Sequence, residues 1–280
     1  MEVIQSIEQM KAFSAQRNKQ GAVVALVPTM GALHEGHLSL IRSAGAEGNE
    51  VVVSIFVNPT QFGQNEDFAN YPRDTETDIA LAAAAGATAV FCPAAAEMYP
   101  VGFQTTIQVG EITHHLCGAS RPGHFNAVAT VVTKLLQIVQ PQIAYFGQKD
   151  YQQLRVIQQV VQDLNMDVII RSHPTVREPD GMAMSSRNRY LSKEERLAAR
   201  AISQSLSLAK EKLMKGEADP EVIRAILRTA LEQDPMVQVE YAEISDPETL
   251  KPMEKTVKGT VLLAIAVRIG ETRLIDNILV

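Results

Sequence analysis

Two histidines three residues apart lie in the segment 28–37, which reads PTMGALHEGH. An apolar run at residues 22–27 precedes this segment, and apolar positions at helical spacing follow it from Leu38 onward. We therefore expect the segment to join a buried strand to the first turn of a helix, where backbone N–H groups and the helix dipole favour an anion. His34 and His37 would lie on one side of that turn and donate hydrogen bonds to phosphoryl oxygens.

Two other interpretations of this histidine pair stay open from the residues alone. The pair could be a surface coincidence, or it could be half of a zinc site. A catalytic zinc ion needs a third protein ligand, and the four other histidines show no ligand-like spacing to this pair. Gly36 also suits a turn better than the helix interior of an H-E-x-x-H metalloprotease. The pattern therefore favours phosphate binding, and we assign no protein metal ligands.

Composition limits the classes of protein to which the chain can belong. Its 280 residues are 46% hydrophobic, enough for one large domain or two modest ones. A net charge of −6 and the absence of a basic run argue against a nucleic-acid partner. The sequence has no basic-then-apolar start and no apolar run near the roughly 20 residues of a membrane span, so we expect a cytoplasmic protein without a membrane partner. Cys92 and Cys117 are expected to be free thiols.

Strands and helices alternate regularly up to about residue 176. Apolar runs predict strands at residues 22–27, 51–57, 89–91, 143–146 and 168–170, with helices such as 75–85 and 127–139 between them. This pattern predicts an α/β fold with a Rossmann-like parallel sheet and helices on both faces. Ligands of such sheets bind outside the carboxyl ends of the strands, where the loops 28–37, 58–63 and 147–150 would converge.

The pattern changes after the turn-like segment 176–181. Ser192, with Glu195 at the capping-box position, predicts a helix that runs towards Gly216, and Asp219-Pro220 predicts the start of another. Strands are expected at residues 237–244, 261–269 and 273–275. We therefore predict two domains, residues 1–176 and a small C-terminal α+β domain of residues 177–280.

Polar side chains in the other loops could complete a binding site. Asn58 and Gln61 offer amides that suit the hydroxyls and carboxylate of a small substrate, although Asn-Pro is also a common turn. Lys149 is well placed as a point charge for phosphate, whereas Asp150 could merely cap the next helix. The segment 184–188, MSSRN, has two hydroxyls and a guanidinium, or it could be a solvated loop.

Six segments in this order resemble a known family: PTMGALHEGH, VNPTQF, YPR, SRPGH, FGQKDYQQL and MSSRN. The H-x-G-H element alone is typical of the nucleotidylyltransferase superfamily, whereas the combination over most of the chain resembles the pantothenate synthetase (pantoate–β-alanine ligase) family. The resemblance implies an ATP-dependent condensation of pantoate with β-alanine to pantothenate. AMP and pyrophosphate would be released, and pantoyl adenylate would be the intermediate. It also implies Mg²⁺ with ATP, and a homodimer.

The resemblance also implies roles for individual residues. His37, His34, Lys149 and Arg187 would be catalytic through charge stabilisation, since the pantoate carboxylate is itself the nucleophile. Pantoate would be bound by Gln61, Gln153 and Asn58, and β-alanine would approach Gln61. The ATP site would consist of Met30, Gly31, Ala32, Leu33, His34, Glu35, Gly36, His37, Gly147, Gln148, Lys149, Asp150, Val176, Met184, Ser185, Ser186 and Arg187. Residues 1–176 would bind nucleotide and pantoate, and residues 177–280 would act as a lid.

One departure from the family pattern follows the SRPGHF segment. The family often has Arg-Gly there, and this chain has Asn126-Ala127, so we treat His124 as structural. Three competing functions remain at this point. They are another H-x-G-H nucleotidylyltransferase that adenylates a different small acid or phosphate acceptor, a zinc-dependent hydrolase, and a nucleotide-binding protein without turnover.

Overall fold

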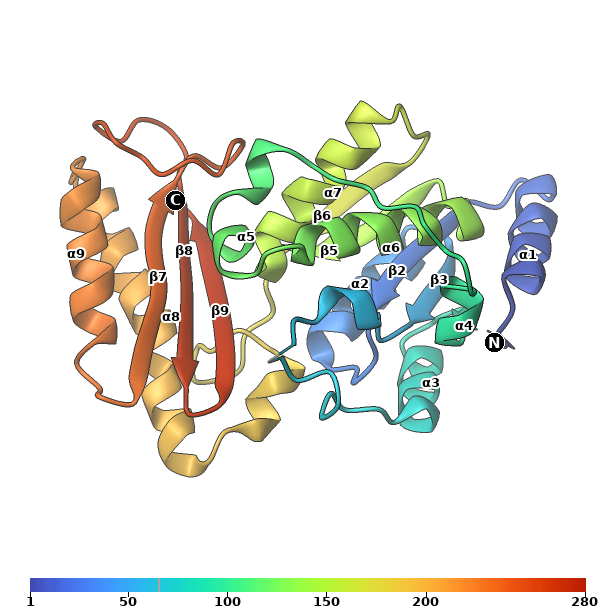
Figure 1. Cartoon of the computed structure of the whole chain (residues 1–280), viewed down its shortest axis with the longest axis horizontal. Helices are drawn as coiled ribbons and strands as arrows, with labels where there is room; N and C mark the ends of the chain where they lie inside the picture. The colour runs from blue at the N-terminus through green and yellow to red at the C-terminus, as the bar shows by residue number, and fades with distance from the viewer. Residues whose placement is uncertain (65) are drawn as a thin grey trace. The chain divides into compact units, whose positions relative to one another are not determined.

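The structure, a computed structural model, describes residues 1–64 and 66–280. The chain forms two compact units (Figure 1). Unit 1 comprises Met1–Val109, Gly123–Gln148 and Val156–Pro174, and unit 2 comprises Gly110–Pro122, Lys149–Arg155 and Thr175–Val280. Residues 110–122, 149–155 and 175–176, which lie within the first 176 residues, therefore belong to unit 2. The division into folding domains at residues 176 and 177 stays a prediction.

Unit 1 contains a six-stranded parallel sheet in the order β1-β4-β3-β2-β5-β6. Its strands are β1 (Glu2–Ile4), β2 (Val24–Thr29), β3 (Glu50–Ile55), β4 (Ala89–Phe91), β5 (Ile143–Gly147) and β6 (Ile169–His173). The predicted parallel α/β sheet is confirmed, and the edge strand β1 is an addition to it. Because β3, β2 and β5 are parallel neighbours, the loops that follow them start next to one another, at the carboxyl ends of these strands.

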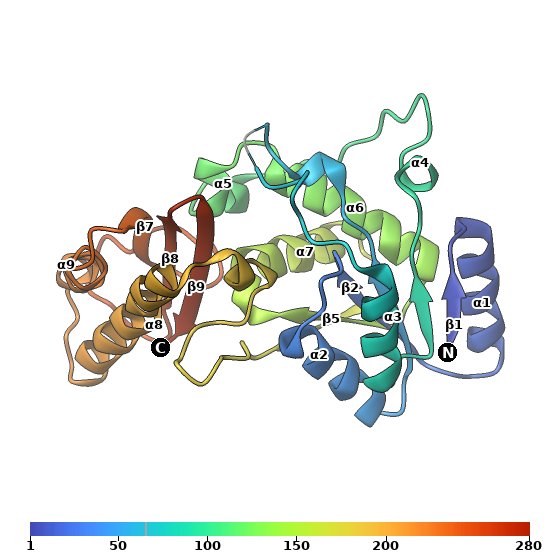
Figure 2. The ribbon, with the colours of Figure 1, turned by 90° about the horizontal axis from the view of Figure 1, so that it is seen from below.

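Helices cover both faces of this sheet (Figure 2). On one face pack α2 (Glu35–Ala46) and α3 (Thr75–Ala84), and on the other α1 (Ile7–Lys19) and α6 (His124–Val139). Ala25 and Val27 of β2 belong to the core beneath α2 and α3, and the alternating Val24 and Leu26 are equally buried. A strand apolar on both faces therefore predicts the doubly covered sheet correctly. Unit 1 also has the short helix α4 (Ala95–Met98).

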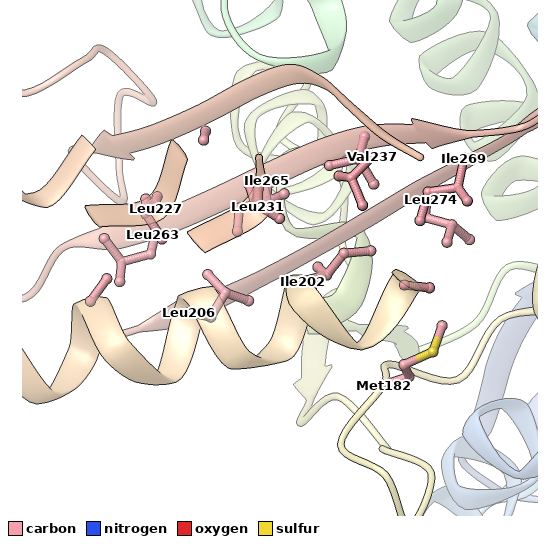
Figure 3. Packing of buried hydrophobic residues seen from close by; sticks show 14 of the residues in the cluster. Met182, Ile202, Leu206, Leu227, Leu231, Val237, Leu263, Ile265, Ile269 and Leu274 are labelled. Atoms are coloured by element: carbon pink, nitrogen blue, oxygen red, sulfur yellow. The ribbon is translucent and has the colours of Figure 1, made fainter. Parts of the chain in front are cut away.

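Unit 2 is built on an antiparallel sheet in the order β7-β8-β9, with β7 (Val237–Ser245), β8 (Leu262–Ile269) and β9 (Thr272–Leu279). Two helices, α8 (Lys193–Met214) and α9 (Pro220–Leu231), pack on each other and on this sheet. Figure 3 shows their shared core, in which side chains of the helices meet those of the strands. The predicted caps are confirmed, with Ser192 and Glu195 forming a capping box and Asp219 capping α9.

Residues 110–122, which are far away in sequence, contact β7 and β9 on the face of the sheet opposite to α8 and α9. It contains the short helix α5 (Cys117–Ser120), and the Cys117 thiol lies 3.1 Å from the Tyr241 hydroxyl. Arg273 donates to Glu240 at 2.7 Å and also contacts the same thiol. Burial raises the pKa of Tyr241. The side chain of Gln152, in α7 (Tyr151–Asp163), donates to the carbonyls of Ile112 and His115.

Within the described residues, no helix is both long enough and apolar enough to span a membrane.

Candidate active site

The two histidines of the H-x-G-H element cap the start of α2. His34 is the N-cap residue, and its Nδ1 accepts a hydrogen bond of 3.2 Å from the N–H of Gly36. The Nδ1 of His37 accepts in turn from the N–H of His34 at 3.3 Å, and the two ring centroids are 4.1 Å apart. Because both Nδ1 atoms act as acceptors, each neutral ring carries its proton on Nε2. The two rings therefore lie side by side at the start of α2, as the spacing predicts.

The backbone of the preceding turn does not present its N–H groups to a ligand, which corrects the expectation from the sequence. The N–H of Gly31 donates to the Thr29 hydroxyl at 3.2 Å. The N–H groups of Ala32 and Leu33 donate to the two carboxylate oxygens of Asp78, at 2.8 and 2.7 Å. A buried carboxylate thus already occupies the place where the sequence predicts an external anion. Side chains must therefore supply the donors for a phosphate here.

Asp78 also explains the glycine in this turn. Gly31 has a φ of +80°, and a Cβ atom there would lie 2.8 Å from a carboxylate oxygen of Asp78. Ala32 has a φ of +49°, a conformation that is uncommon for a residue with a side chain. The two hydrogen bonds that the Asp78 carboxylate accepts from the N–H groups of Ala32 and Leu33 hold this strained backbone in place.

The loop after β3 contacts the histidine loop through Gln61. Asn58, which is 1% exposed, caps the 3₁₀ helix η1 (Pro59–Gln61) by accepting from the N–H of Thr60 at 3.3 Å. Its Nδ2 donates to Gln61 Oε1 at 3.2 Å, and the Nε2 of Gln61 lies 3.0 Å from the sulfur of Met30. Asn58 is thus a capping residue, as the turn alternative requires, and it also orients Gln61. His124 Nδ1 lies 2.9 Å from the Gln61 carbonyl, so the structural role expected for His124 is to hold this loop.

The lysine segment follows β5 directly. Gly147 ends this strand, which neighbours β2 in unit 1, and Gln148 begins the 3₁₀ helix η3 (Gln148–Asp150). In unit 2, the Lys149 ammonium lies 3.9 Å from the Asp150 carboxylate, and the Lys149 carbonyl accepts a hydrogen bond of 2.7 Å from Asn277. Gln153 lies in the first part of α7.

The segment from Val176 to Arg187, also in unit 2, is an ordered hairpin. Its two arms meet where the Val176 carbonyl accepts from the N–H of Met184 at 2.9 Å and where Arg177 pairs with Ala183. Ser185 then caps the 3₁₀ helix η4 (Ser186–Tyr190). Ser186 is buried, so the alternative of a solvated loop does not describe this segment.

Carboxylates at the tip of this hairpin are held by an arginine of α8. Arg196 donates to Glu178 and to Asp180, each at 2.7 Å, and Glu178 accepts from the side chain of Asn188 at 2.6 Å. The hydrogen bond from Arg196 lowers the pKa of Glu178. Partial burial acts to raise the pKa of Asp180, but hydrogen bonds from Arg196 and from the N–H of Met182 outweigh it and lower that pKa. The hairpin is therefore anchored by charge as well as by backbone bonds.

Comparison with known proteins identifies the family. A family model described as pantoate-beta-alanine ligase matches residues 2–279. A pantothenate synthetase of Moorella thermoacetica is 53% identical over 278 residues, which are 99% of this chain and 98% of the relative. The chain belongs to the pantoate-beta-alanine ligase family.

Solved structures of pantoate-beta-alanine ligases share the fold as well. The crystal structure of pantothenate synthetase from Thermus thermophilus matches with a TM-score of 0.92 at 44% identity and covers 99% of each chain. A ligase from Francisella tularensis, described as complexed with beta-gamma ATP and beta-alanine, matches with a TM-score of 0.80 at 35% identity, over 100% of this chain and 97% of that one. The chain is therefore a ligase, which decides against a zinc-dependent hydrolase and against a protein without turnover.

Several residues that hold the predicted site segments in their own units were missed by sequence reasoning. Asp78 had a detectable signal, because it lies four residues before Ala82 on the buried side of α3. Arg196 looked like part of an ordinary charged helix start. Asp276 and Asn277 are buried polar residues that interrupt the apolar pattern of a strand. This interruption was a signal for a functional role, but the strand prediction took it for the end of the strand.

We expect Asp78→Asn to disrupt the histidine turn. The asparagine amide keeps one acceptor oxygen but turns its NH₂ group towards the other backbone N–H. One buried hydrogen bond is then lost, and the free energy of unfolding should fall by about 1–3 kcal/mol. Urea unfolding should show that loss, and the rate of adenylate formation should fall with it. Asp74→Asn is the matched control, because Asp74 is the exposed N-cap of the same helix and asparagine caps equally well. Equal stability of the two variants would contradict the role of Asp78.

We expect Arg196→Gln to lower the free energy of unfolding at pH 7 by about 1–2 kcal/mol. The pKa of Glu178 is lower in the folded state, so its ion pair with Arg196 is fully stabilising above the ordinary pKa of 4.5 and is lost as the pH falls through the folded value. The difference between variant and wild type should therefore shrink on acidification. Denaturant titrations from pH 7 to pH 3 test this, and a difference independent of pH would contradict it.

Proposed function

We propose that this chain joins pantoate to β-alanine with ATP and releases AMP and pyrophosphate. The family match over residues 2–279 carries this proposal, together with the two histidine rings fixed at the start of α2. The Francisella tularensis ligase, described with beta-gamma ATP and beta-alanine, supports the choice of nucleotide and amine.

Two displacements would make up the reaction. In the first, a pantoate carboxylate oxygen attacks the α-phosphorus of ATP, and the bond to the leaving pyrophosphate breaks to give pantoyl adenylate. In the second, the β-alanine amine attacks the acyl carbon, loses a proton and expels AMP. Neither step needs a nucleophile from the protein, so catalysis consists of positioning and of stabilising the developing charge.

The catalytic roles proposed for the histidines follow from their geometry. With Nδ1 of each ring fixed by a backbone N–H, the Nε2–H groups of His34 and His37 would donate to phosphoryl oxygens of ATP. Lys149 and Arg187 would add positive charge at the phosphates. The rest of the ATP site would consist of residues 30–37, 147–150, Val176 and 184–186.

The proposed pantoate site centres on Gln61. Its contacts with Met30 and Asn58 place a fixed amide beside the histidine loop. Gln153 and Asn58 would complete the pantoate site, and β-alanine would approach at Gln61.

We propose that ATP is used as its Mg²⁺ complex. Magnesium keeps several waters and is commonly bound through substrate phosphates and one or two carboxylates, so it needs no cage of protein ligands. Within the described residues, no group of three or more His, Cys, Asp or Glu side chains is placed to hold a metal ion. A homodimer, a cytoplasmic location and a lid formed by residues 177–280 also stay predictions.

Product analysis by mass spectrometry tests the proposed function. The protein is mixed with ATP, Mg²⁺ and pantoate, with and without β-alanine. We expect pantothenate and AMP only in the complete mixture, and enzyme-bound pantoyl adenylate when β-alanine is omitted. ATP binding without either product would instead indicate a different acid or phosphate acceptor.

We expect Arg187→Ala to slow adenylate formation by roughly 100-fold, because a positive charge at the phosphates is lost. Single-turnover measurements with ATP and pantoate would follow the adenylate directly. Arg189→Ala is the matched control, since Arg189 is another arginine on the same 3₁₀ helix and has no role in the proposed site. Unchanged adenylation in Arg187→Ala would remove the role proposed for this arginine.

A further inference from the structure

Two successive polar residues interrupt the apolar pattern of β9 in unit 2. Asp276 is 3% exposed and Asn277 is 8% exposed, so both side chains are buried. Successive side chains of a strand point to opposite faces of its sheet. Buried polar groups are costly unless they are paired. The partner of Asn277 is Lys149, in a proposed nucleotide-binding segment, and the partner of Asp276 is Arg177, in the hairpin that leads to another such segment.

Asp276 holds the hairpin that carries Ser185 to Arg187. Its carboxylate accepts two hydrogen bonds from the guanidinium of Arg177, at 2.6 and 3.0 Å. Arg177 also donates to the Gly181 carbonyl at 3.0 Å, across the turn of the same hairpin. A planar guanidinium paired in this way fixes orientation as well as distance. Asp276 therefore anchors the base of the hairpin to β9.

Asn277 holds the lysine segment. Its side-chain Nδ2 donates to the backbone carbonyl of Lys149 at 2.7 Å, and its own N–H donates to the carboxylate of Asp276 at 2.8 Å. The lysine backbone is thus tied to the same point of β9 as Arg177. The side chain of Lys149 takes no part in this bond, and its ammonium lies 3.9 Å from the Asp150 carboxylate.

We propose that Asp276 and Asn277 are positioning residues, which set the distance between the Lys149 ammonium and the Ser185–Arg187 segment. This inference rests on the proposed function, because it assumes that both segments bind the ATP phosphates. A charge displaced by about 1 Å can cost roughly 100-fold in rate. Since two adjacent residues hold both segments, a change at either one moves one cationic segment relative to the other.

Asn277→Asp is the most direct test. The substitution keeps the size of the side chain but replaces the donor to the Lys149 carbonyl with a carboxylate oxygen that repels it. We expect single-turnover adenylation to fall roughly 10- to 100-fold. The second step, measured by adding β-alanine to preformed pantoyl adenylate, should stay within about 2-fold of wild type, because pyrophosphate has already left. We also expect the affinity for the Mg²⁺ complex of ATP, measured by calorimetry, to fall.

Two further variants separate positioning from stability. Glu243→Gln is the matched control, because Glu243 pairs with Arg224 and ties α9 to β7 in the same unit without touching either segment. Arg177→Lys keeps the charge beside Asp276 but loses the paired hydrogen bonds, and it provides the test if Asn277→Asp does not fold. Thermal melting shows which variants are folded at the assay temperature.

Loss of adenylation or of ATP affinity in Asn277→Asp or Arg177→Lys, beyond any loss in Glu243→Gln, supports the inference. Losses no greater than those of the control overturn it, since the pair would then act on stability alone. A wild-type protein that binds ATP but forms no pantoyl adenylate would remove the proposed function. The ATP affinities of the variants would then decide the positioning inference by themselves.

Discussion

The carboxylate of Asp78 is the constraint on which the geometry of unit 1 depends most. It accepts from two successive backbone N–H groups of the turn between β2 and α2, and it is buried. These bonds hold Ala32 in a left-handed conformation and fix the point at which α2 begins. His34 is the N-cap of that helix, so the position of both imidazoles is set from α3, more than forty residues further along the chain. The carboxylate of Asp78 therefore fixes the geometry of the two histidines that we propose as catalytic.

This arrangement also decides how the turn can meet an anion. A strand-to-helix turn often binds phosphate with its free N–H groups, as in dinucleotide-binding folds. In this chain the N–H groups of residues 31–34 donate to protein acceptors. The hydrogen-bond donors that we propose for a phosphate are therefore side chains, and side chains need supports of their own. His34 and His37 are supported by the helix start itself. The ring of His34 accepts from the N–H of Gly36, and the ring of His37 accepts from the N–H of His34, so the same hydrogen bonds cap α2 and orient both rings.

Prediction from sequence succeeded where one physical effect dominates. The central strands were predicted because burial on both faces requires continuous apolar runs, and the start of α8 was predicted because Ser192 and Glu195 form a local cap. The edge strand β1 was missed because only Ile4 of its three residues is buried, which leaves no pattern to detect. The partners of the turn at residues 31–33 were missed for another reason. A hydrogen bond from Leu33 to Asp78 spans 45 residues, and no local pattern encodes it.

The prediction for β9 failed in a more informative way. Residues 273–275 were predicted, whereas the strand runs over Thr272–Leu279. Prediction stopped at Asp276 because two polar residues break the apolar pattern, and polar residues in a strand interior normally mark its end. Here they continue the strand because each has a buried partner, Arg177 for one and the Lys149 carbonyl for the other. Prediction from the apolar pattern fails at residues 276 and 277 because these side chains form hydrogen bonds to other segments instead of packing in an apolar core. The wrongly predicted end of β9 therefore marks the part of unit 2 that holds both the hairpin and the Lys149 segment.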